Sequence, residues 1–544
     1  MSNELPSSAV IFLALFGLFY ASFDVLVEGR ILGLKSNSEP DDSLVYLWPL
    51  PSQFSHGEAT ISVDPGLSLD LGGNGGDSSI VREAFQRYRE IIFKHSSGEK
   101  ADYDLNKIKI LVKSDNETLH LGVDESYSLY VAKQSDLSIF GDATIEANTV
   151  YGALRGLETF SQLCSFNYGT KSVEVHKAPW LIQDEPRFVF RGLLLDTSRH
   201  YLPIGIIKQV IESMSYAKLN VLHWHIIDEQ SFPLEIPSYP NLWKGAYSKW
   251  ERYTVEDALE IVEFAKMRGI NIMAEIDVPG HGDSWGAGYS DLWPSPTCHE
   301  PLDVSNNFTF DVISGILTDM RKIFPFELFH LGGDEVNTDC WSLTPHVKQW
   351  LQTHNMTAKD AYQYFVLRTQ GLAIAKNWTP VNWEETFNTF QANLHPQTVV
   401  HNWLGPGVCP RAVAKGFRCI FSNQGVWYLD HLDIPWEGFY TSEPLEGIDD
   451  ASAQKLVLGG EVCMWGEAAD SSDVQQTIWP RAAAAAERLW SRREVISAGN
   501  LNGTVLPRLQ YFRCLLNRRD IPAAPVKNTL ARRPPFGPGS CYEQ

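Results

Sequence analysis

Eight short apolar runs recur along the second part of this chain, and they constrain its fold more than any other feature. Many of them end in polar or aromatic residues. Strands that are apolar almost throughout are buried on both faces, which is typical of a parallel sheet. The runs are residues 190–198, 221–228, 271–277, 328–335, 379–385, 398–403, 418–423 and 456–467.

Helical patterns fill several of the gaps between these runs. Residues 254–269 start with the capping pair Thr254 and Asp257, and residues 308–324 have a similar apolar spacing. Parallel strands joined by crossover helices predict an α/β fold, a (β/α)8 TIM barrel, over residues 185–544. The later gaps are irregular, so the sequence defines the strands better than the helices.

A smaller α+β domain is predicted ahead of the barrel, over residues 45–182. Runs with strand-like and helix-like spacing alternate there, and a chain of 544 residues favours two or more domains. Asp77 is expected to cap the first helix. The expected strands are residues 59–64, 107–114 and 126–133, and the expected helices are residues 78–94 and 149–163.

The N-terminal segment indicates the secretory pathway. Residues 9–23 form an uninterrupted apolar run, whose length suits a signal-peptide core and is short of the roughly 20 residues of a membrane span. The residues before this run contain no Lys or Arg and include Glu4, which is unusual for a signal. We predict a signal peptide over residues 1–28, with an uncleaved anchor as the alternative.

Sequons for N-glycosylation and eight cysteines fit the same route. Asn377 is the poorest sequon, because Pro380 follows its Thr379 directly. No CxxC pair and no Cys/His cluster indicates zinc, and we predict neither a metal nor a cofactor. The sequons start at Asn116, Asn307, Asn355, Asn377 and Asn502.

The polar ends of the eight runs predict a carbohydrate site, because the carboxyl ends of barrel strands carry the chemistry of this fold. A formal net charge of −21 argues against nucleic acid as a partner. Any strand must end in something polar, but this explains polar residues at one or two strand ends and not a rim of carboxylates and tryptophans at most of them. The rim comprises Asp196, Arg199, Asp228, Glu229, Asp277, Asp334, Glu335, Trp383, Glu384, Glu385, Trp403, Trp465 and Glu467.

Asp334 and Glu335 stand side by side at the end of one run. Paired carboxylates normally cleave a glycosidic bond from opposite sides, about 5–5.5 Å apart in retaining enzymes and about 6.5–9.5 Å apart in inverting ones. Neighbours on an extended segment point in opposite directions. This pair therefore fits the usual two-carboxylate scheme poorly.

Seven motifs occur in the order typical of one enzyme family. They are RGLLLDTSRHYLP (191–203), KLNVLHWHIIDEQSFP (218–233), AEIDVPGHGDSW (274–285), HLGGDEV (330–336), NWEE (382–385), GGEVCMWGE (459–467) and WPRAAAAAERLW (479–490). Through them the chain resembles the β-N-acetylhexosaminidases of glycoside hydrolase family 20, and it looks most like the plant vacuolar-type members. The motifs cover nearly the whole chain beyond its N-terminal segment.

The resemblance implies a role for the adjacent acidic pair. Enzymes of this family have no protein nucleophile: the substrate's 2-acetamido oxygen attacks the anomeric carbon, and water opens the resulting oxazolinium ion with net retention. Glu335 is then the general acid and later the base, and Asp334 orients the acetamido group. The expected activity is exo-hydrolysis of terminal β-linked GlcNAc or GalNAc from N-glycans, other glycoconjugates or chitooligosaccharides.

The resemblance also implies substrate-binding residues. Arg191 is expected to hold the 3- and 4-hydroxyls of the sugar, with an ordinary buried ion pair as the alternative. Asp228 and His281 are expected to tune the pKa of Glu335, with a structural histidine as the alternative. The remaining expected contacts are Trp383, Trp403 and Trp465 as aromatic walls, Tyr428 as donor to the acetamido carbonyl, and Asp430 and Glu467 near the 4- and 6-hydroxyls.

Disulfide bonds Cys298–Cys340 and Cys514–Cys541 are implied in the same way, and a Cys409–Cys419 bond has weaker support. Cys164 and Cys463 are expected to be free. No cysteine precedes Cys164, so the N-terminal-domain bridge of animal lysosomal relatives cannot form here.

Two other classes of function compete with this interpretation: a non-catalytic sugar-binding protein, and a conventional glycosidase with a protein nucleophile. The intact Asp334, Glu335, Tyr428 and Arg191 argue against the first, and a trapped covalent glycosyl-enzyme would support the second. The sequence leaves open the natural glycan, a vacuolar or extracellular destination, and the homodimer common among relatives.

Overall fold

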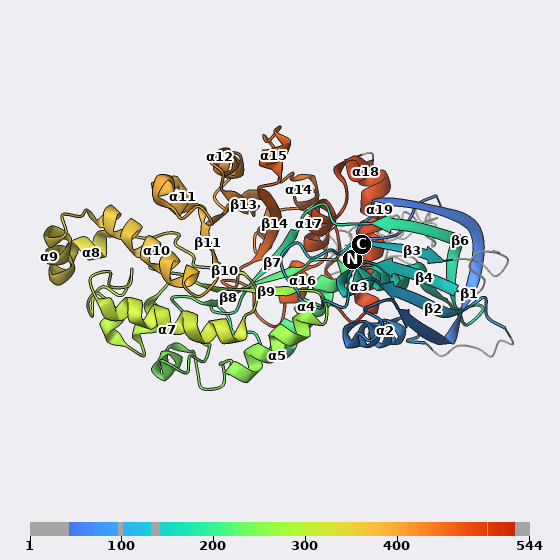
Figure 1. Cartoon of the computed structure of the whole chain (residues 1–544), viewed down its shortest axis with the longest axis horizontal. Helices are drawn as coiled ribbons and strands as arrows, with labels where there is room; N and C mark the ends of the chain where they lie inside the picture. Colours follow the sequence, from blue (N-terminus) through green and yellow to red (C-terminus); the bar gives the residue numbers. More distant parts are fainter. Residues whose placement is uncertain (1–42, 96–101, 132–141, 498, 528–544) are drawn as a thin grey trace, which may run out of the picture.

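The computed structural model describes residues 43–95, 102–131, 142–497 and 499–527. The predicted signal segment, residues 1–28, and Cys541 lie outside the described residues. A sheet domain and a barrel domain lie end to end along the long axis of the molecule (Figure 1). None of the helices in the described ranges has the length and apolar character needed to cross a membrane.

The N-terminal domain consists of β1 (Gln53–Gly72), α2 (Ser79–Ile92), β2 (Leu105–Val112), β3 (Tyr127–Val131), β4 (Asp142–Ala147), α3 (Val150–Leu163), β5 (Cys164–Asn167) and β6 (Ser172–Asp184). Within the described residues its strands form one mixed sheet in the order β1-β2-β4-β3-β6-β5, and β1 also pairs with β6. The amphipathic helix α3 is buried along nearly its whole length.

Most elements predicted for this domain are confirmed, with two corrections. β1 is far longer than the predicted residues 59–64, because it bends through irregular register and pairs with both β2 and β6. Ser78 rather than Asp77 caps α2, since its side chain accepts a hydrogen bond from the Val81 amide.

All eight predicted barrel strands are confirmed. Along the described chain they close into a parallel barrel in the order β10-β11-β12-β13-β14-β7-β8-β9. The strands are β7 (Phe190–Asp196), β8 (Val221–Ile227), β9 (Asn271–Ile276), β10 (Leu328–His330), β11 (Thr379–Trp383), β12 (Val399–His401), β13 (Arg418–Phe421) and β14 (Val457–Met464).

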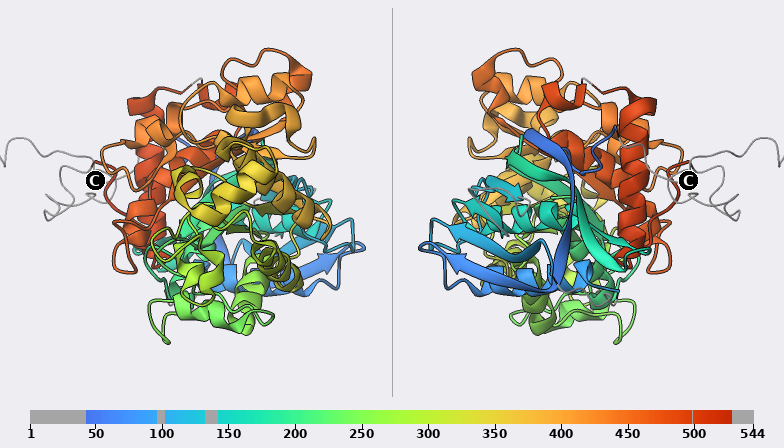
Figure 2. Two further views of the ribbon diagram at one scale, coloured as in Figure 1. Left: turned by 90° about the vertical axis from the view of Figure 1, so that its left-hand side faces the viewer. Right: turned by 90° about the vertical axis from the view of Figure 1, so that its right-hand side faces the viewer.

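The helices surround this barrel (Figure 2). The predicted capping box of α5 is present, because Thr254 and Asp257 each bond the other's backbone amide. The helices are α4 (Ile204–Tyr216), α5 (Val255–Lys266), α6 (Asp283–Gly286), α7 (Asn307–Ile323), α8 (Asp339–Leu343), α9 (Pro345–Thr353), α10 (Ala358–Ile374), α11 (Glu384–Phe390), α12 (Val408–Ala414), α13 (Gln424–Trp427), α14 (Trp436–Thr441), α15 (Ala451–Gln454), α16 (Val474–Ile478), α17 (Arg481–Trp490), α18 (Arg493–Ser497) and α19 (Leu506–Arg518), with short 3-10 turns at Pro240–Gly245, Ser290–Leu292 and Gln391–Asn393 and a π turn at Leu501–Val505.

The N-terminal domain covers the amino ends of the barrel strands. Glu125, in the segment before β3, forms buried ion pairs with Arg155 of α3 at 2.8 Å and with Arg191 of β7 at 2.6 Å. Asp184, at the end of β6, pairs with Lys218 at 3.0 Å. The carboxyl ends of the strands therefore lie at the opposite end of the barrel, on the side of α8 and α9 (Figure 1).

The predicted covalent features are mostly confirmed. Disulfide bonds join Cys298 to Cys340 and Cys409 to Cys419. Of the described cysteines, Cys164 and Cys463 are free. The Cys514–Cys541 bond stays a prediction, because Cys541 lies outside the described residues. All five sequon asparagines are exposed, as glycosylation requires: Asn116, Asn307, Asn355, Asn377 and Asn502.

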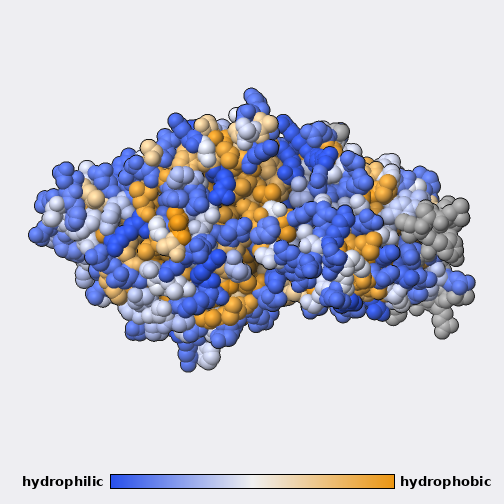
Figure 3. All heavy atoms as spheres, in the orientation of Figure 1, coloured by the Kyte–Doolittle hydropathy of each residue, from blue (hydrophilic) through white to orange (hydrophobic). Residues whose placement is uncertain are grey.

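Hydrophilic residues cover most of the face seen in Figure 3, and hydrophobic residues gather mainly over its middle. Isolated exposed apolar side chains are normal on a folded protein and need no special function.

Candidate active site

The segment that carries Asp334 and Glu335 is a turn and not a strand. β10 ends at His330, and Gly332, Gly333 and Glu335 have φ values of +59°, +97° and +51°. A Cβ atom on Gly332 would lie 1.8 Å from Oδ1 of Asp277, so only glycine fits there. The expectation that the acidic pair is extended, with its side chains on opposite sides, is therefore wrong.

Both carboxylates of the pair face one imidazole, that of His281. Its Nε2 lies 3.6 Å from Oδ2 of Asp334 and 3.7 Å from Oε2 of Glu335, and its Nδ1 lies 3.1 Å from Oδ1 of Asp228. His281 itself has a φ of +52°, a left-handed conformation that is unusual for a side chain of this size. The structure thus brings together four of the residues predicted for the site.

The environment of His281 favours its charged form. Burial lowers the pKa of the imidazole, but the Asp334 and Asp228 carboxylates outweigh burial and raise this pKa to about 10. Burial also disfavours ionised Asp228, yet hydrogen bonds from His225 and His281 hold the pKa of that carboxyl well below its usual range. His281 is therefore an imidazolium at neutral and acidic pH, and it lies beside the ionised Asp228 carboxylate.

The two carboxylates differ in their access to solvent. The side chain of Asp334 is 13% exposed, whereas that of Glu335 is 61% exposed. A group bound among the buried side chains can therefore meet Asp334, while a leaving group or a water molecule can reach Glu335 from outside.

The structure contradicts the substrate-binding role expected of Arg191. Its side chain is fully buried at the amino end of β7, where it pairs with Glu125 and donates to the carbonyls of Lys218 and Phe188. Asp196, at the other end of the same strand, is five residues away, or roughly 17 Å at 3.3 Å per residue. Arg191 therefore forms an ordinary buried ion pair, which was the alternative to its expected substrate-binding role.

Arg199 occupies the position that Arg191 was expected to fill. Its guanidinium lies 2.8 Å from Asp228, 3.1 Å from Asp196 and 3.5 Å from Glu467, and 5.2 Å from the ring centre of Trp465. These carboxylates outweigh its burial and raise its pKa further. Arg199 is thus a permanently charged donor beside the pocket.

Four aromatic side chains form one wall of the site. Trp383 is buried and its ring centre is 6.0 Å from that of Trp465. Tyr428 is 6.1 Å from Trp465 and 6.5 Å from Trp403, whose ring is nearly parallel to it. The three tryptophans, which end separate predicted runs, and Tyr428, which the resemblance implied, lie together in the structure.

Two further acids line the site and have no role in the sequence-based assignment. Glu385 accepts hydrogen bonds from Nε1 of Trp403 at 3.0 and 3.1 Å, and burial together with Asp334 raises its pKa to about 8. Burial and Asp334 also raise the pKa of Asp277 well above its ordinary value. Their positions at the ends of predicted strands were the signal that could have identified them.

Asp430 and Glu467 lie at the edge of the site. Asp430 is 3.8 Å from His431, and burial raises the pKa of Asp430 to about 6. Within the described residues, several buried polar atoms of this site have no hydrogen-bond partner, a pattern that a polar ligand would complete. They are Asp334 Oδ1, His281 Nε2, Asp430 Oδ1 and Trp465 Nε1.

Three groups of described side chains have the spacing of metal ligands: His223 with His401 and Glu461, His223 with Glu275 and His330, and Asp277 with His281 and Asp334. In the first two groups His223 lies 2.8 Å from Glu461 and 3.0 Å from Glu275, and His330 lies 2.8 Å from Glu275. The two carboxylates outweigh burial and raise the pKa of His223 to about 9, so this imidazole supplies a positive charge between them. The absence of a metal stays a prediction.

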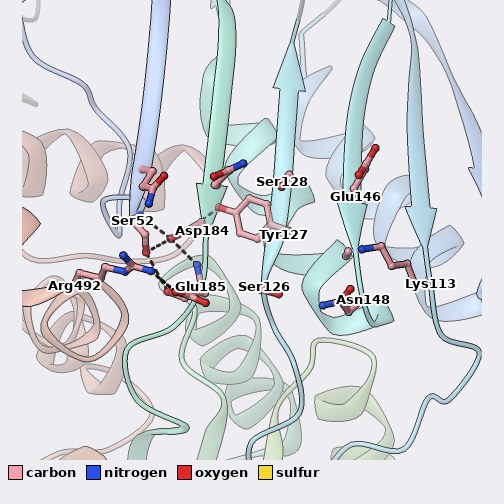
Figure 4. A pocket seen from close by; sticks show the side chains of 13 residues that line it. Ser52, Lys113, Ser126, Tyr127, Ser128, Glu146, Asn148, Asp184, Glu185 and Arg492 are labelled. Atoms are coloured by element: carbon pink, nitrogen blue, oxygen red, sulfur yellow. Dashed lines mark hydrogen bonds and ion pairs between the residues drawn. The ribbon is translucent and has the colours of Figure 1, made fainter.

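A separate polar cavity of about 270 Å³ lies by the N-terminal sheet (Figure 4). Its buried carboxylate, Asp184, already accepts hydrogen bonds from Ser52, Tyr127 and Trp490 in addition to its ion pair with Lys218. Glu185 pairs with Arg492 across the same cavity. These contacts join the two domains, and the cavity lies away from the acidic pair.

A barrel with adjacent acids, a charged arginine and an indole wall at its carboxyl end defines a glycosidase-type site. Comparison with known proteins specifies the class further. The model of "Glycosyl hydrolase family 20, catalytic domain" matches residues 188–493, and the model "beta-acetyl hexosaminidase like" matches residues 47–163.

The chain belongs to glycosyl hydrolase family 20 and is a β-N-acetylhexosaminidase. It is similar to beta-hexosaminidase 1 of Arabidopsis thaliana, with 71% identity over 94% of this chain and 96% of that protein, and to beta-hexosaminidase 3 of the same plant, with 54% identity over 92% and 94%. The structure of a chitobiase from Flavobacterium johnsoniae matches with 28% identity and a TM-score of 0.77, over 90% of this chain and 75% of that one.

Proposed function

We propose that the enzyme is a retaining exo-β-N-acetylhexosaminidase that uses the 2-acetamido group of its substrate as the nucleophile. The observation that carries the proposal is the shared position of Asp334 and Glu335 beside His281. Two carboxylates on one side of a site can serve the leaving oxygen and the acetamido group, while neither has to reach the far face of the sugar.

In this mechanism Glu335 donates a proton to the glycosidic oxygen while the bond from that oxygen to the anomeric carbon breaks. The acetamido oxygen forms a bond to the anomeric carbon, and Asp334 accepts a hydrogen bond from the acetamido N–H and stabilises the positive charge of the oxazolinium ion. Water then attacks the anomeric carbon and gives a proton to Glu335, while the bond from that carbon to the acetamido oxygen breaks and the neutral acetamido group is restored. The result is retention.

The remaining side chains hold the sugar. Arg199 donates to the ring hydroxyls, a role supported by its fixed position between Asp228, Asp196 and Glu467. Trp383, Trp403 and Trp465 enclose the acetamido methyl and the sugar face, Tyr428 donates to the acetamido carbonyl, and Asp430 and Glu467 contact the 4- and 6-hydroxyls.

Replacement of Glu335 by Gln tests the proposal. We expect kcat on an aryl N-acetyl-β-glucosaminide to fall by about 10²–10⁴-fold, since the acid is lost, while binding of N-acetylglucosamine is largely retained. Glu229→Gln is the matched control, because Glu229 is an exposed acid of the same rim. Unchanged turnover of E335Q would overturn the assignment.

The substrates that we propose are terminal β-linked GlcNAc and GalNAc on N-glycans, other glycoconjugates and chitooligosaccharides. Exposed sequons and disulfide bonds support passage through the secretory pathway. We propose a vacuolar or lysosome-like destination, with the cell exterior as the alternative. A homodimer stays a prediction, to be checked by measuring the mass of the protein in solution.

A further inference from the structure

Four side chains from neighbouring strands meet at one carboxylate beneath the active site. This carboxylate is that of Glu275 on β9, and it is fully buried. It lies 2.6 Å from Nδ1 of His225, 2.8 Å from Nδ1 of His330 and 3.0 Å from Nε2 of His223. Nε1 of Trp383 donates a hydrogen bond to it at 3.1 Å. The hydrogen bonds to His225 and Trp383 fix the orientation of these two side chains.

Two of these partners lead to the proposed active site. Trp383 is itself part of the aromatic wall. His225 continues the chain, because its Nε2 lies 2.7 Å from Oδ2 of Asp228, whose Oδ1 lies 3.1 Å from Nδ1 of His281. Glu275 is therefore one contact from the wall and three contacts from the imidazole that faces the acidic pair.

Charges alternate along the second path. Burial opposes ionisation of Glu275, but His330, His225 and His223 outweigh it and hold the pKa of this carboxyl well below its usual range. Burial lowers the pKa of His225, but Glu275 and then Asp228 raise it to about 10. Glu275, His225, Asp228 and His281 thus carry negative, positive, negative and positive charge in turn.

We propose that Glu275 is a positioning residue for both parts of the reaction: it orients Trp383 of the acetamido wall and, through His225 and Asp228, holds His281 beside the acidic pair. The inference rests on the proposed function and extends it to a residue that does not touch the substrate.

Other charged groups that face this path set the background for a pH measurement. Glu275 faces His223 and His225 on β8, His330 on β10 and Trp383 on β11, with Asp277, His401 and Glu461 near by. His225 also meets the Trp465 ring edge-on at 5.0 Å. His281 faces Asp228, Asp334, Glu335, Arg199 and Glu300.

The test compares Glu275→Gln with Glu461→Gln. Glu461 is an equally buried carboxylate of the same cluster, and in the described contacts it reaches His223 and His401 rather than Trp383 or His225. For E275Q we expect kcat/KM on an aryl N-acetyl-β-glucosaminide to fall about 10- to 100-fold, since a displaced wall and imidazole misplace the reacting groups.

The pH profile separates positioning from mere stability. Loss of the Glu275 charge lowers the pKa of His225, so Asp228 loses one of its charged partners as the pH rises and keeps Arg199 and His281. We expect the basic limb of kcat/KM in E275Q to move to lower pH by about one unit or more. The limb of E461Q should match the wild type, although both variants lower Tm. The double variant E275Q/H225Q should lose the shift, because the titrating imidazole is gone.

An unshifted limb in E275Q, or the same shift in E461Q, would overturn the inference. Should E275Q fail to fold, His225→Gln tests the path from Glu275 through His225 and Asp228 to His281, with the Glu275–Trp383 bond left in place. Wild-type kcat/KM in H225Q would equally overturn the inference. Absence of activity in the wild-type enzyme would instead refute the proposed function, so the two failures are distinguishable.

Discussion

Substitution of Arg199 by Met tests the site most sharply, because the sequence pointed to a different arginine. Of the five N–H donors of its guanidinium, one reaches Gln230 at 3.1 Å, one Asp196 at 3.1 Å and one Asp228 at 2.8 Å. Two donors remain for sugar hydroxyls, one of them on the nitrogen that lies 3.5 Å from the half-exposed Glu467 carboxylate. At about 1.5 kcal/mol each for a charged donor, their loss costs about 3 kcal/mol, or about 100-fold in kcat/KM.

The assay is steady-state hydrolysis of an aryl N-acetyl-β-glucosaminide, with Arg191→Met as the matched control. Arg191 is fully buried against Glu125, so R191M removes one of the two arginine partners of this buried carboxylate, leaves Arg155 as the other, and should destabilise the fold by about 3 kcal/mol. Its kcat/KM per folded molecule should stay within about threefold of wild type. The reasoning is refuted if R199M keeps near-wild-type kcat/KM, or if folded R191M loses about as much as R199M.

Three further changes probe other parts of the structure. Gly332→Ala places a Cβ against Asp277 and should reduce kcat about 100-fold or more in a folded protein, and a loss below threefold would contradict the tight turn. Removal of the Cys298–Cys340 bond, whose cysteines are 42 residues apart, should cost about 4 kcal/mol of unfolding free energy, seen as a lower Tm. Glu385→Gln should gain stability relative to wild type as the pH rises from about 4.5 to about 8. The raised pKa of the Glu385 carboxyl stabilises the folded wild type at low pH, and the wild type loses this stabilisation as the pH rises through that pKa. An equal Tm difference between the two proteins at pH 4.5 and pH 8 would contradict this prediction.

The positions of the strands were predictable from the sequence, because each strand of a parallel barrel is buried on both faces and reads as an apolar run. The grouping of Trp383, Trp403 and Trp465 followed, since the carboxyl ends of such strands meet at one end of the barrel, whereas Tyr428 was expected there only through the resemblance. β1 was predicted only in part, because its remaining residues alternate in exposure and carry no continuous apolar pattern.

Backbone geometry was not predictable in the same way. The role expected of Arg191 came from the family resemblance. The predicted run 190–198 itself has Arg191 near its amino end and is followed by Arg199 at its carboxyl end, as the structure shows. The left-handed conformations of His281 and Glu335 also have no local signal, since non-glycine residues rarely adopt them and tertiary contacts hold them there. The role of Glu275 depends on contacts among four strands, which sequence spacing alone does not specify.

The most direct test of the central claim compares hydrolysis of an aryl N-acetyl-β-glucosaminide with hydrolysis of the matching aryl β-glucoside at mildly acidic pH. The two substrates differ only in the 2-acetamido group. We expect cleavage of the first alone, because the acetamido oxygen is the nucleophile and Asp334 acts on that group. Equal cleavage of both would mean that the protein supplies the nucleophile, and the roles proposed for Asp334 and Glu335 would be wrong.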